Sequence, residues 1–157
     1  NISINSLEKE IIAINLNIKE FRPESKVDVV VCNPPYKEVG TGVQNENKVK
    51  YIARHEKECT LEDVFGCAKA ILKQRGKLYV VHKPQRLSDL ISIARKYKLE
   101  PKNIRFVFPK VNSKPSIVLI EYVYCGGNEL NILPPLIEYD EDGNYTKEIL
   151  EIYGSEK

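Results

Sequence analysis

Short apolar runs and longer amphipathic segments alternate along the chain, and this alternation predicts a series of strands and helices. Five runs are rich in β-branched side chains and have the length of a strand: residues 11–16, 27–32, 77–82, 104–108 and 117–124. The run at 27–32 is apolar on both faces, which is typical of a buried parallel strand. The pattern therefore predicts a sheet whose central strands are covered on both sides.

Two segments carry apolar residues at helical spacing. The first begins at Thr60, because Thr60 and Asp63 have the spacing of a capping box, and we expect it to end at Gly76. The second covers residues 87–97 and stops before Pro101, since the residue before a proline avoids helical geometry. Each helix follows one strand and precedes another, as in an α/β protein.

The order of elements defines the fold class. The strands at 104–108 and 117–124 are joined by too few residues for a parallel crossover, so we expect an antiparallel pair. The series is strand, strand, helix, strand, helix and then this pair, which predicts an α/β fold with a mostly parallel sheet. We divide the chain into a domain at 1–127 and an acidic appendix at 128–157, with a short helix after Thr146, packed on the domain.

The strand at 27–32 ends in a motif that suggests chemistry, Asn33-Pro34-Pro35-Tyr36. Ligands of open α/β sheets bind at the carboxyl ends of the strands. The two prolines have a fixed φ and no N–H, so the corner is rigid and rich in acceptors. Asn33 adds a carbonyl acceptor and Tyr36 a flat face for stacking.

A corner of this kind suits an amine whose lone pair is delocalised, such as an exocyclic amine of a base or a carboxamide. The Asn33 side chain and the Pro34 carbonyl could accept its two N–H groups and turn the lone pair toward an electrophile. The alternative is a proline-rich turn after a core strand, with Tyr36 packing only. The position of the motif after an apolar strand favours the functional interpretation.

Composition limits the class of protein. The chain has 157 residues, of which 42% are hydrophobic and 29% charged, the proportions of one soluble domain. No apolar run is long enough to span a membrane, and no signal peptide opens the chain. The four cysteines have neither paired nor metal-type spacing, which favours a reduced, cytoplasmic setting.

The net charge of +2 is distributed unevenly. Residues 1–129 hold 22 basic and 15 acidic side chains, whereas residues 130–157 hold 2 and 7. A basic body suits a polyanion such as RNA, although two ordinary solvated surfaces would give the same count. Arg54 and His55 are either a phosphate or base contact or part of a salt-bridge cluster before the first helix. For His82, a structural role is favoured over substrate contact.

The Asn-Pro-Pro-Tyr motif resembles that of S-adenosylmethionine-dependent amino-methyltransferases, which modify adenine N6, cytosine N4 or protein glutamine. Within that class, the chain is similar to the bacterial tRNA (adenine-N6) methyltransferase family that acts on position 37 of valine tRNA. The segments that carry this resemblance are residues 28–36, 53–56, 60–63, 81–84, 98–101, 118–121, 133–137 and 139–143.

The resemblance implies a Rossmann-like class I methyltransferase fold, S-adenosylmethionine as methyl donor and tRNA as partner. It implies three groups of site residues. The catalytic corner is Asn33, Pro34, Pro35 and Tyr36; the cofactor contacts are Asn17 and Asn33; and the RNA contacts are Lys37, Lys48, Lys50, Arg54, His55 and Lys110. A protein-glutamine methyltransferase and a non-catalytic RNA-binding fragment are the alternatives.

The chain also departs from the family. It lacks the glycine-rich loop after the first strand and the acidic residue that ends the second, and it has Asn17 where the family usually has Asp. We therefore expect a C-terminal portion without its N-terminal strands, which is inactive alone. In the family, the strand matching residues 11–16 is separated from the strand at 27–32 by two others. Unpaired strand edges favour a homodimer.

Overall fold

In the computed structural model, residues 1–34 and 59–154 are described, and they form a mixed α/β fold around one sheet. The strands of this part lie in the order β1-β2-β4-β3-β5, with β6 also paired to β3. The elements are η1 (Ser3–Asn5), β1 (Val27–Cys32), α2 (Leu61–Ile71), β2 (Leu72–His82), η2 (Pro84–Arg86), α3 (Leu87–Lys96), β3 (Leu99–Phe108), β4 (Ile117–Tyr124), β5 (Asn131–Ile132), β6 (Leu136–Ile137) and α4 (Lys147–Ile152).

The pairing of the strands confirms the predicted topology. β1 pairs with β2 in parallel, with Cys32 opposite Val80. β4 runs antiparallel to both β2 and β3, and Val118 lies opposite His82 on one side and Phe106 on the other. The carboxyl ends of β1, β2 and β3 therefore meet at one edge of the sheet. We call it the carboxyl edge.

Helix α2 begins where its sequence signal predicts. The Thr60 hydroxyl accepts a hydrogen bond from the Asp63 backbone N–H at 3.2 Å, and the Asp63 carboxylate accepts one from the Thr60 N–H at 2.8 Å. This capping box satisfies two backbone donors at the start of the helix. Burial tends to raise the pKa of Asp63, but the hydrogen bonds from Thr60 and Lys19 outweigh it and lower the pKa.

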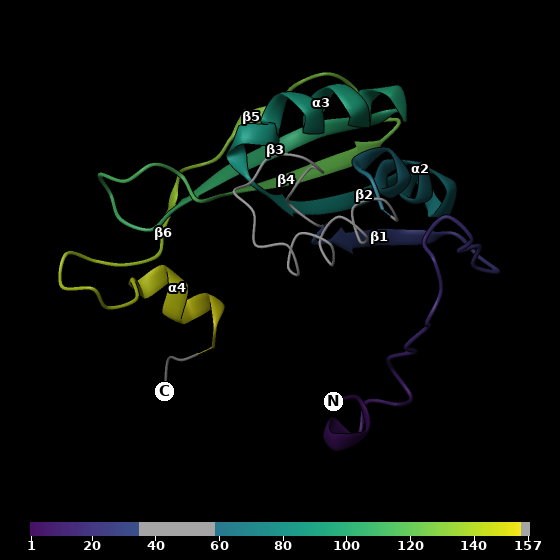
Figure 1. Cartoon of the computed structure of the whole chain (residues 1–157), viewed down its shortest axis with the longest axis horizontal. Helices are drawn as coiled ribbons and strands as arrows, with labels where there is room; N and C mark the ends of the chain where they lie inside the picture. The colour runs from purple at the N-terminus through teal and green to yellow at the C-terminus, as the bar shows by residue number, and fades with distance from the viewer. Residues whose placement is uncertain (35–58, 155–157) are drawn as a thin grey trace, which may run out of the picture.

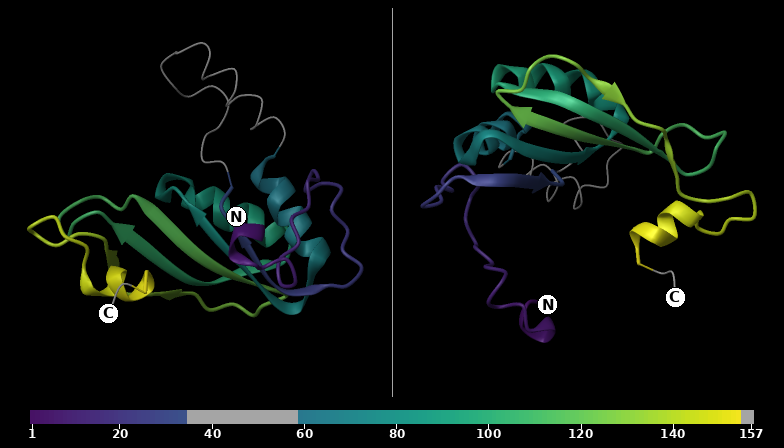
Figure 2. Two further views of the ribbon diagram at one scale, coloured as in Figure 1. Left: turned by 90° about the horizontal axis from the view of Figure 1, so that it is seen from below. Right: turned by 180° about the vertical axis from the view of Figure 1, so that it is seen from behind.

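One face of the sheet is covered by α2 and α3, which lie together on the same side (Figures 1 and 2). The core between them and the sheet is mostly apolar and includes Phe65, Leu78, Leu90 and Ile120. Phe65 also meets the ring of Tyr122 edge-on, with the centroids 5.4 Å apart. This packing fixes the helices to β2 and β4.

The opposite face is covered only in part by the described residues. Leu136 of β6 and Ile149 of α4 pack there against Val107. The Arg105 guanidinium binds the Glu148 carboxylate at 2.6 Å, which ties α4 to β3. Beyond α4, a groove of about 300 Å³ runs over the centre of the sheet, lined by Tyr79, Val80, Val81, Asn103, Arg105, Leu119, Ile120, Glu121 and Leu133.

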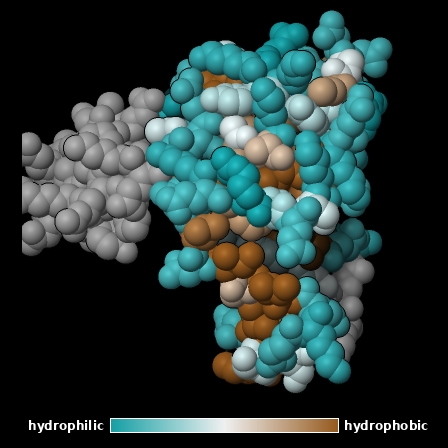
Figure 3. Space-filling view, turned by 90° about the vertical axis from the view of Figure 1, so that its right-hand side faces the viewer, coloured by the Kyte–Doolittle hydropathy of each residue, from teal (hydrophilic) through white to brown (hydrophobic). Residues whose placement is uncertain are grey.

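The N-terminal segment and the outer strand differ from expectation. Residues 11–16 form no strand, and Ile12 and Ile14 are 84% and 60% exposed. Figure 3 shows exposed apolar side chains in the lower part of the molecule, where Figure 1 places this segment. The expected burial of β1 is also wrong for one face, since Val31 is 74% exposed. No described strand pairs with the outer edge of β1, so residues 11–16 have no strand neighbour there.

Two element boundaries also require correction. Helix α2 ends at Ile71, five residues before Gly76, and Gly76 lies within β2. A Cβ on Gly76 would lie 3.1 Å from the Asp28 carbonyl oxygen, so the glycine permits close approach of β1 rather than ending a helix. Strand β3 begins at Leu99 and contains Pro101, which is tolerated because the register with β4 shifts there.

Candidate active site

Asn33 and Pro34, the described part of the predicted amine-binding corner, lie at the carboxyl edge, directly after β1. Asn33 is exposed and Pro34 is buried. Because Cys32 lies opposite Val80 in a parallel pair, the corner follows β1 beside the last residues of β2. The structure therefore places an exposed amide next to a buried, conformationally fixed proline, at the edge where α/β sheets bind ligands.

The side chain before the corner contributes no charge. Cys32 is half-buried, and burial, reinforced by Cys59 and Cys67, raises the pKa of its thiol to about 11. Cys32 therefore stays a neutral thiol at physiological pH. A neutral neighbour leaves the polarity of the corner to the Asn33 amide and the backbone carbonyls.

His82 ends β2 at the same edge and is only 1% exposed. Its Nδ1 accepts a hydrogen bond from the Lys83 backbone N–H at 2.8 Å. In the neutral imidazole the proton then lies on Nε2, an assignment that follows from this hydrogen bond. The geometry agrees with the favoured structural role of His82.

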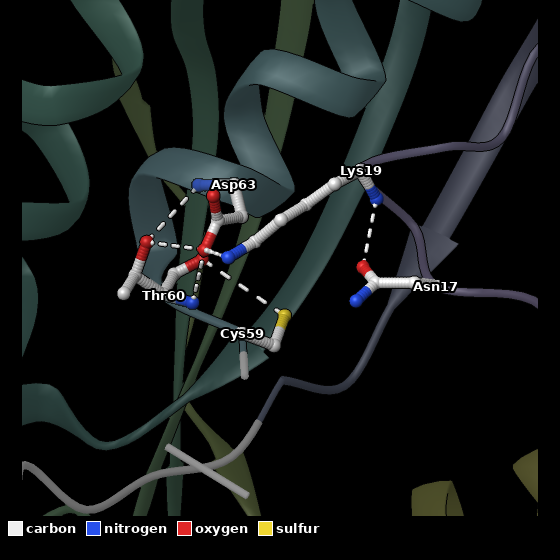
Figure 4. A network of polar contacts seen from close by, with 5 residues as sticks. All are labelled: Asn17, Lys19, Cys59, Thr60 and Asp63. Carbon is white, nitrogen blue, oxygen red and sulfur yellow. Dashed lines mark hydrogen bonds and ion pairs between the residues drawn. The ribbon is translucent and has the colours of Figure 1, made fainter. Parts of the chain in front are cut away.

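Asn17 lies close to the start of α2, as Figure 4 shows. Its side-chain oxygen accepts a hydrogen bond from the Lys19 backbone N–H at 3.0 Å, and the Lys19 ammonium lies 3.3 Å from the Asp63 carboxylate. Asn17 thus forms a local turn with Lys19, and Lys19 binds Asp63 of the α2 capping box.

Lys110 lies at the carboxyl edge, in the loop between β3 and β4, and its side chain is exposed. Sequence reasoning missed Lys83, whose ammonium donates to the Ser116 carbonyl at 3.3 Å and so links the end of β2 to the same loop. Its position directly after a predicted strand was the available signal. The remaining predicted site residues lie outside the described residues: Pro35, Tyr36, Lys37, Lys48, Lys50, Arg54 and His55.

The predicted site residues that the structure describes do not line the groove. The groove lies on the uncovered face of the sheet and is lined by apolar and mixed side chains. Asn33 is exposed at the carboxyl edge, and the side-chain oxygen of Asn17 accepts its hydrogen bond from Lys19 near the start of α2. Within residues 1–34 and 59–154, no cluster of His, Cys, Asp and Glu could hold a metal ion, and no helix is long and apolar enough to cross a membrane.

Solved structures share the fold. A predicted O-methyltransferase from Agrobacterium tumefaciens superposes with a TM-score of 0.62 at 18% identity, covering 84% of this chain and 53% of that one. A proposed DNA modification methylase from Thermus thermophilus superposes with a TM-score of 0.51 at 17% identity, covering 86% and 70%. The chain has a methyltransferase fold, which confirms the predicted fold class.

No family model matches the chain. Curated relatives, however, are similar to it in sequence. The chain is 25% identical over 116 residues to the tRNA1(Val) (adenine(37)-N6)-methyltransferase of Aliivibrio salmonicida, covering 71% of this chain and 49% of the relative. It is 27% identical over 108 residues to the protein of the same name from Phocaeicola vulgatus, covering 69% and 45%. The chain therefore spans about half the length of the curated relatives it matches.

Proposed function

We propose that the chain provides the amine-binding part of an S-adenosylmethionine-dependent methyltransferase that modifies adenine N6 in tRNA, at position 37 of valine tRNA. One observation carries the proposal: Asn33 and Pro34 directly follow β1 at the carboxyl edge of a methyltransferase fold. The curated relatives support the substrate. Since the chain spans only about half of their length, the activity is proposed for the whole protein rather than for these 157 residues.

The corner acts by orienting the amine. The Asn33 side-chain oxygen and the Pro34 carbonyl accept hydrogen bonds from the two N–H groups of the adenine N6. Tyr36 stacks on the base after the base has flipped out. These two hydrogen bonds hold the lone pair of N6 toward the methyl donor. The neutral Cys32 thiol adds no competing charge. The N6 proton is lost to water after transfer.

S-adenosylmethionine supplies an electrophilic methyl group when it is bound, and the fold and the relatives support it as the donor. Asn33 fits a contact to both the amine and the donor, because it is exposed at the carboxyl edge. Asn17 is proposed as a donor contact only after its turn with Lys19 rearranges.

The substrate is tested by offering labelled S-adenosylmethionine with either unmodified valine tRNA or a release factor. The assay uses the 157-residue chain and the protein at the length of its relatives. We expect methyl transfer to tRNA alone, and only by the longer protein. Transfer to the release factor would replace the proposal with glutamine methylation, and RNA binding without any transfer would favour the non-catalytic module.

The remaining proposals concern organisation. We propose that residues 1–127 belong to the methyltransferase domain, that residues 128–157 are its appendix, and that the protein acts in the cytoplasm, where tRNA is modified. The ion pair between Arg105 and Glu148 supports an appendix held on the domain. We also propose that the outer edge of β1 pairs with a second copy of the chain, since an exposed strand edge invites pairing.

The homodimer is tested by adding a charge to the exposed strand. We expect the 157-residue chain to be a dimer by light scattering and Val31→Lys, at a side chain that is 74% exposed, to be a monomer. The matched control is Val111→Lys in the β3–β4 loop, where the side chain is 72% exposed. A monomeric wild-type chain, or equal effects of both substitutions, would contradict the dimer.

A further inference from the structure

The β3–β4 loop, residues 109–116, is a fixed projection rather than a loose connection. The Ser113 hydroxyl donates to the Lys110 carbonyl at 2.6 Å and accepts from the Lys110 N–H at 3.1 Å. The Ser113 N–H also binds the Lys110 carbonyl, at 3.0 Å. Pro109 and Pro115 fix φ at both ends of the loop. The tip is therefore held in one shape before it meets a partner.

This projection presents cations and an apolar side chain to solvent. Lys110, Asn112 and Lys114 are exposed, and Val111 between them is 72% exposed. Among the residues that the structure describes, neither lysine forms an ion pair. Two uncompensated ammonium groups beside an apolar contact and an amide match a nucleic-acid strand, which offers phosphates together with bases.

The loop and the amine-binding corner share the carboxyl edge. In Figure 1 the loop projects at the end of the sheet toward which the β1 arrow points. Three strand spacings of about 4.8 Å separate β1 from β3 in the order β1-β2-β4-β3, which gives a span of about 14 Å. Lys83 lies on this span, at the end of β2, and its ammonium reaches the Ser116 carbonyl. Cations thus extend from the corner to the loop.

The side chains at the carboxyl edge change from basic to acidic beyond β3. Strand β6 pairs with the other side of β3, and the chain continues there into Glu138, Asp140, Glu141 and Asp142. The Tyr139 N–H binds the Pro109 carbonyl at 3.0 Å, so this acidic turn adjoins the base of the loop. A polyanion would be repelled from that side and attracted along the side of Lys83. The edge therefore favours one direction for a bound strand.

We propose that the β3–β4 loop binds the single-stranded RNA next to the adenine held at Asn33, with Lys110 and Lys114 on its backbone phosphates. This inference rests on the proposed function and adds the direction in which the strand leaves the site. Recognition of an unpaired strand agrees with the exposed tip, because sequence-specific RNA binding mostly uses single-stranded loops. Val111 and Asn112 contact the neighbouring base.

The test compares two variants with the same change of charge. Lys110→Glu/Lys114→Glu alters the loop, and Lys26→Glu/Lys98→Glu alters two exposed lysines before β1 and β3, at the opposite edge of the sheet. The probe is a fluorescein-labelled 12-nucleotide RNA single strand, and its anisotropy is measured with the 157-residue chain between 50 and 200 mM salt. Unfolding midpoints show that both variants fold.

We expect the loop variant to bind at least about tenfold more weakly and the control variant to stay within about threefold. The salt dependence of log K should flatten by roughly 1.4 on loss of two phosphate contacts to a single strand. Equal weakening of both variants, or competition by polyglutamate as effective as by unlabelled RNA, would overturn the inference. In the protein at the length of its relatives, methylation of tRNA by the loop variant at the wild-type KM would overturn the inference while leaving the proposed function intact. RNA binding through the loop without tRNA methylation by that longer protein would contradict only the function.

Discussion

Replacement of Asn33 by alanine is expected to lower the rate of methyl transfer to tRNA by roughly 10²- to 10³-fold, or about 3–4 kcal/mol of transition-state stabilisation. In the proposed function, the side-chain oxygen of Asn33 accepts a hydrogen bond from one N–H of the amine, and this bond acts most strongly as the nitrogen becomes tetrahedral. The loss should fall on kcat, since the base is held mainly by stacking and phosphate contacts. The rate constant is measured as single-turnover transfer from labelled S-adenosylmethionine. The assay uses the protein at the length that shows activity.

Two further variants separate this role from a structural one. Asn33→Asp keeps an acceptor in place and should retain more activity than the alanine variant. Asn128→Ala removes an exposed amide beyond the end of β4, far from the carboxyl edge, and should not change the rate. RNA affinity and unfolding midpoint should stay at wild-type values in all three. An alanine variant within tenfold of wild type would show that Asn33 does not orient the amine.

The sequence predicts the parts of the fold that local chemistry decides. Thr60 and Asp63 satisfy each other's backbone donors, so the start of α2 follows from two residues three apart. The antiparallel pairing of β3 and β4 follows from the length of their connection. The corner at Asn33 is likewise predictable, because a proline pair after an apolar strand must leave the sheet at its carboxyl edge.

Features that depend on distant partners could not be predicted in the same way. Residues 11–16 have the composition of a strand but form none, because a strand needs a neighbour and no described strand offers one. Gly76 resembles a helix stop in sequence, yet its role is set by the Asp28 carbonyl on β1. Pro101 argues against a strand until the shift in register opposite β4 is known.

The candidate site likewise has features that the sequence predicts and features that depend on the fold. Lys110 could be selected from the sequence because it lies in a basic loop. Its relation to Lys83 could not, since Lys83 reaches the same loop only in the folded chain, through the Ser116 carbonyl. The acidic turn lies beside the β3–β4 loop because β6 pairs with the outer side of β3. That pairing is a tertiary contact in which two residue pairs are in register. The corner is thus predicted from the sequence alone, whereas the proposed direction of a bound strand depends on the fold.

Replacement of Phe65 by alanine is expected to destabilise the chain by about 3–5 kcal/mol, and loss of the aromatic pair contributes about 0.5–1.5 kcal/mol of this. The Phe65 side chain is fully buried and meets Tyr122, whose hydroxyl donates to the Leu90 carbonyl at 3.3 Å. The cavity would therefore open where α2, α3 and β4 meet. Because a domain is stable by only about 5–15 kcal/mol, this loss is a large fraction of the total. Urea unfolding followed by circular dichroism measures it.

Phe65→Leu keeps most of the apolar volume and should lose less than half as much stability, whereas Val111→Ala, at an exposed side chain, should change it by less than about 0.5 kcal/mol. Below the unfolding transition, Phe65→Ala should still bind the RNA single strand, since the carboxyl edge holds none of the atoms removed. A full loss of binding in the folded variant would mean that the position of α2 controls the edge. The Asn33 and Phe65 variants should therefore fail in opposite ways: the first stays folded and loses transfer, and the second keeps its site and loses stability.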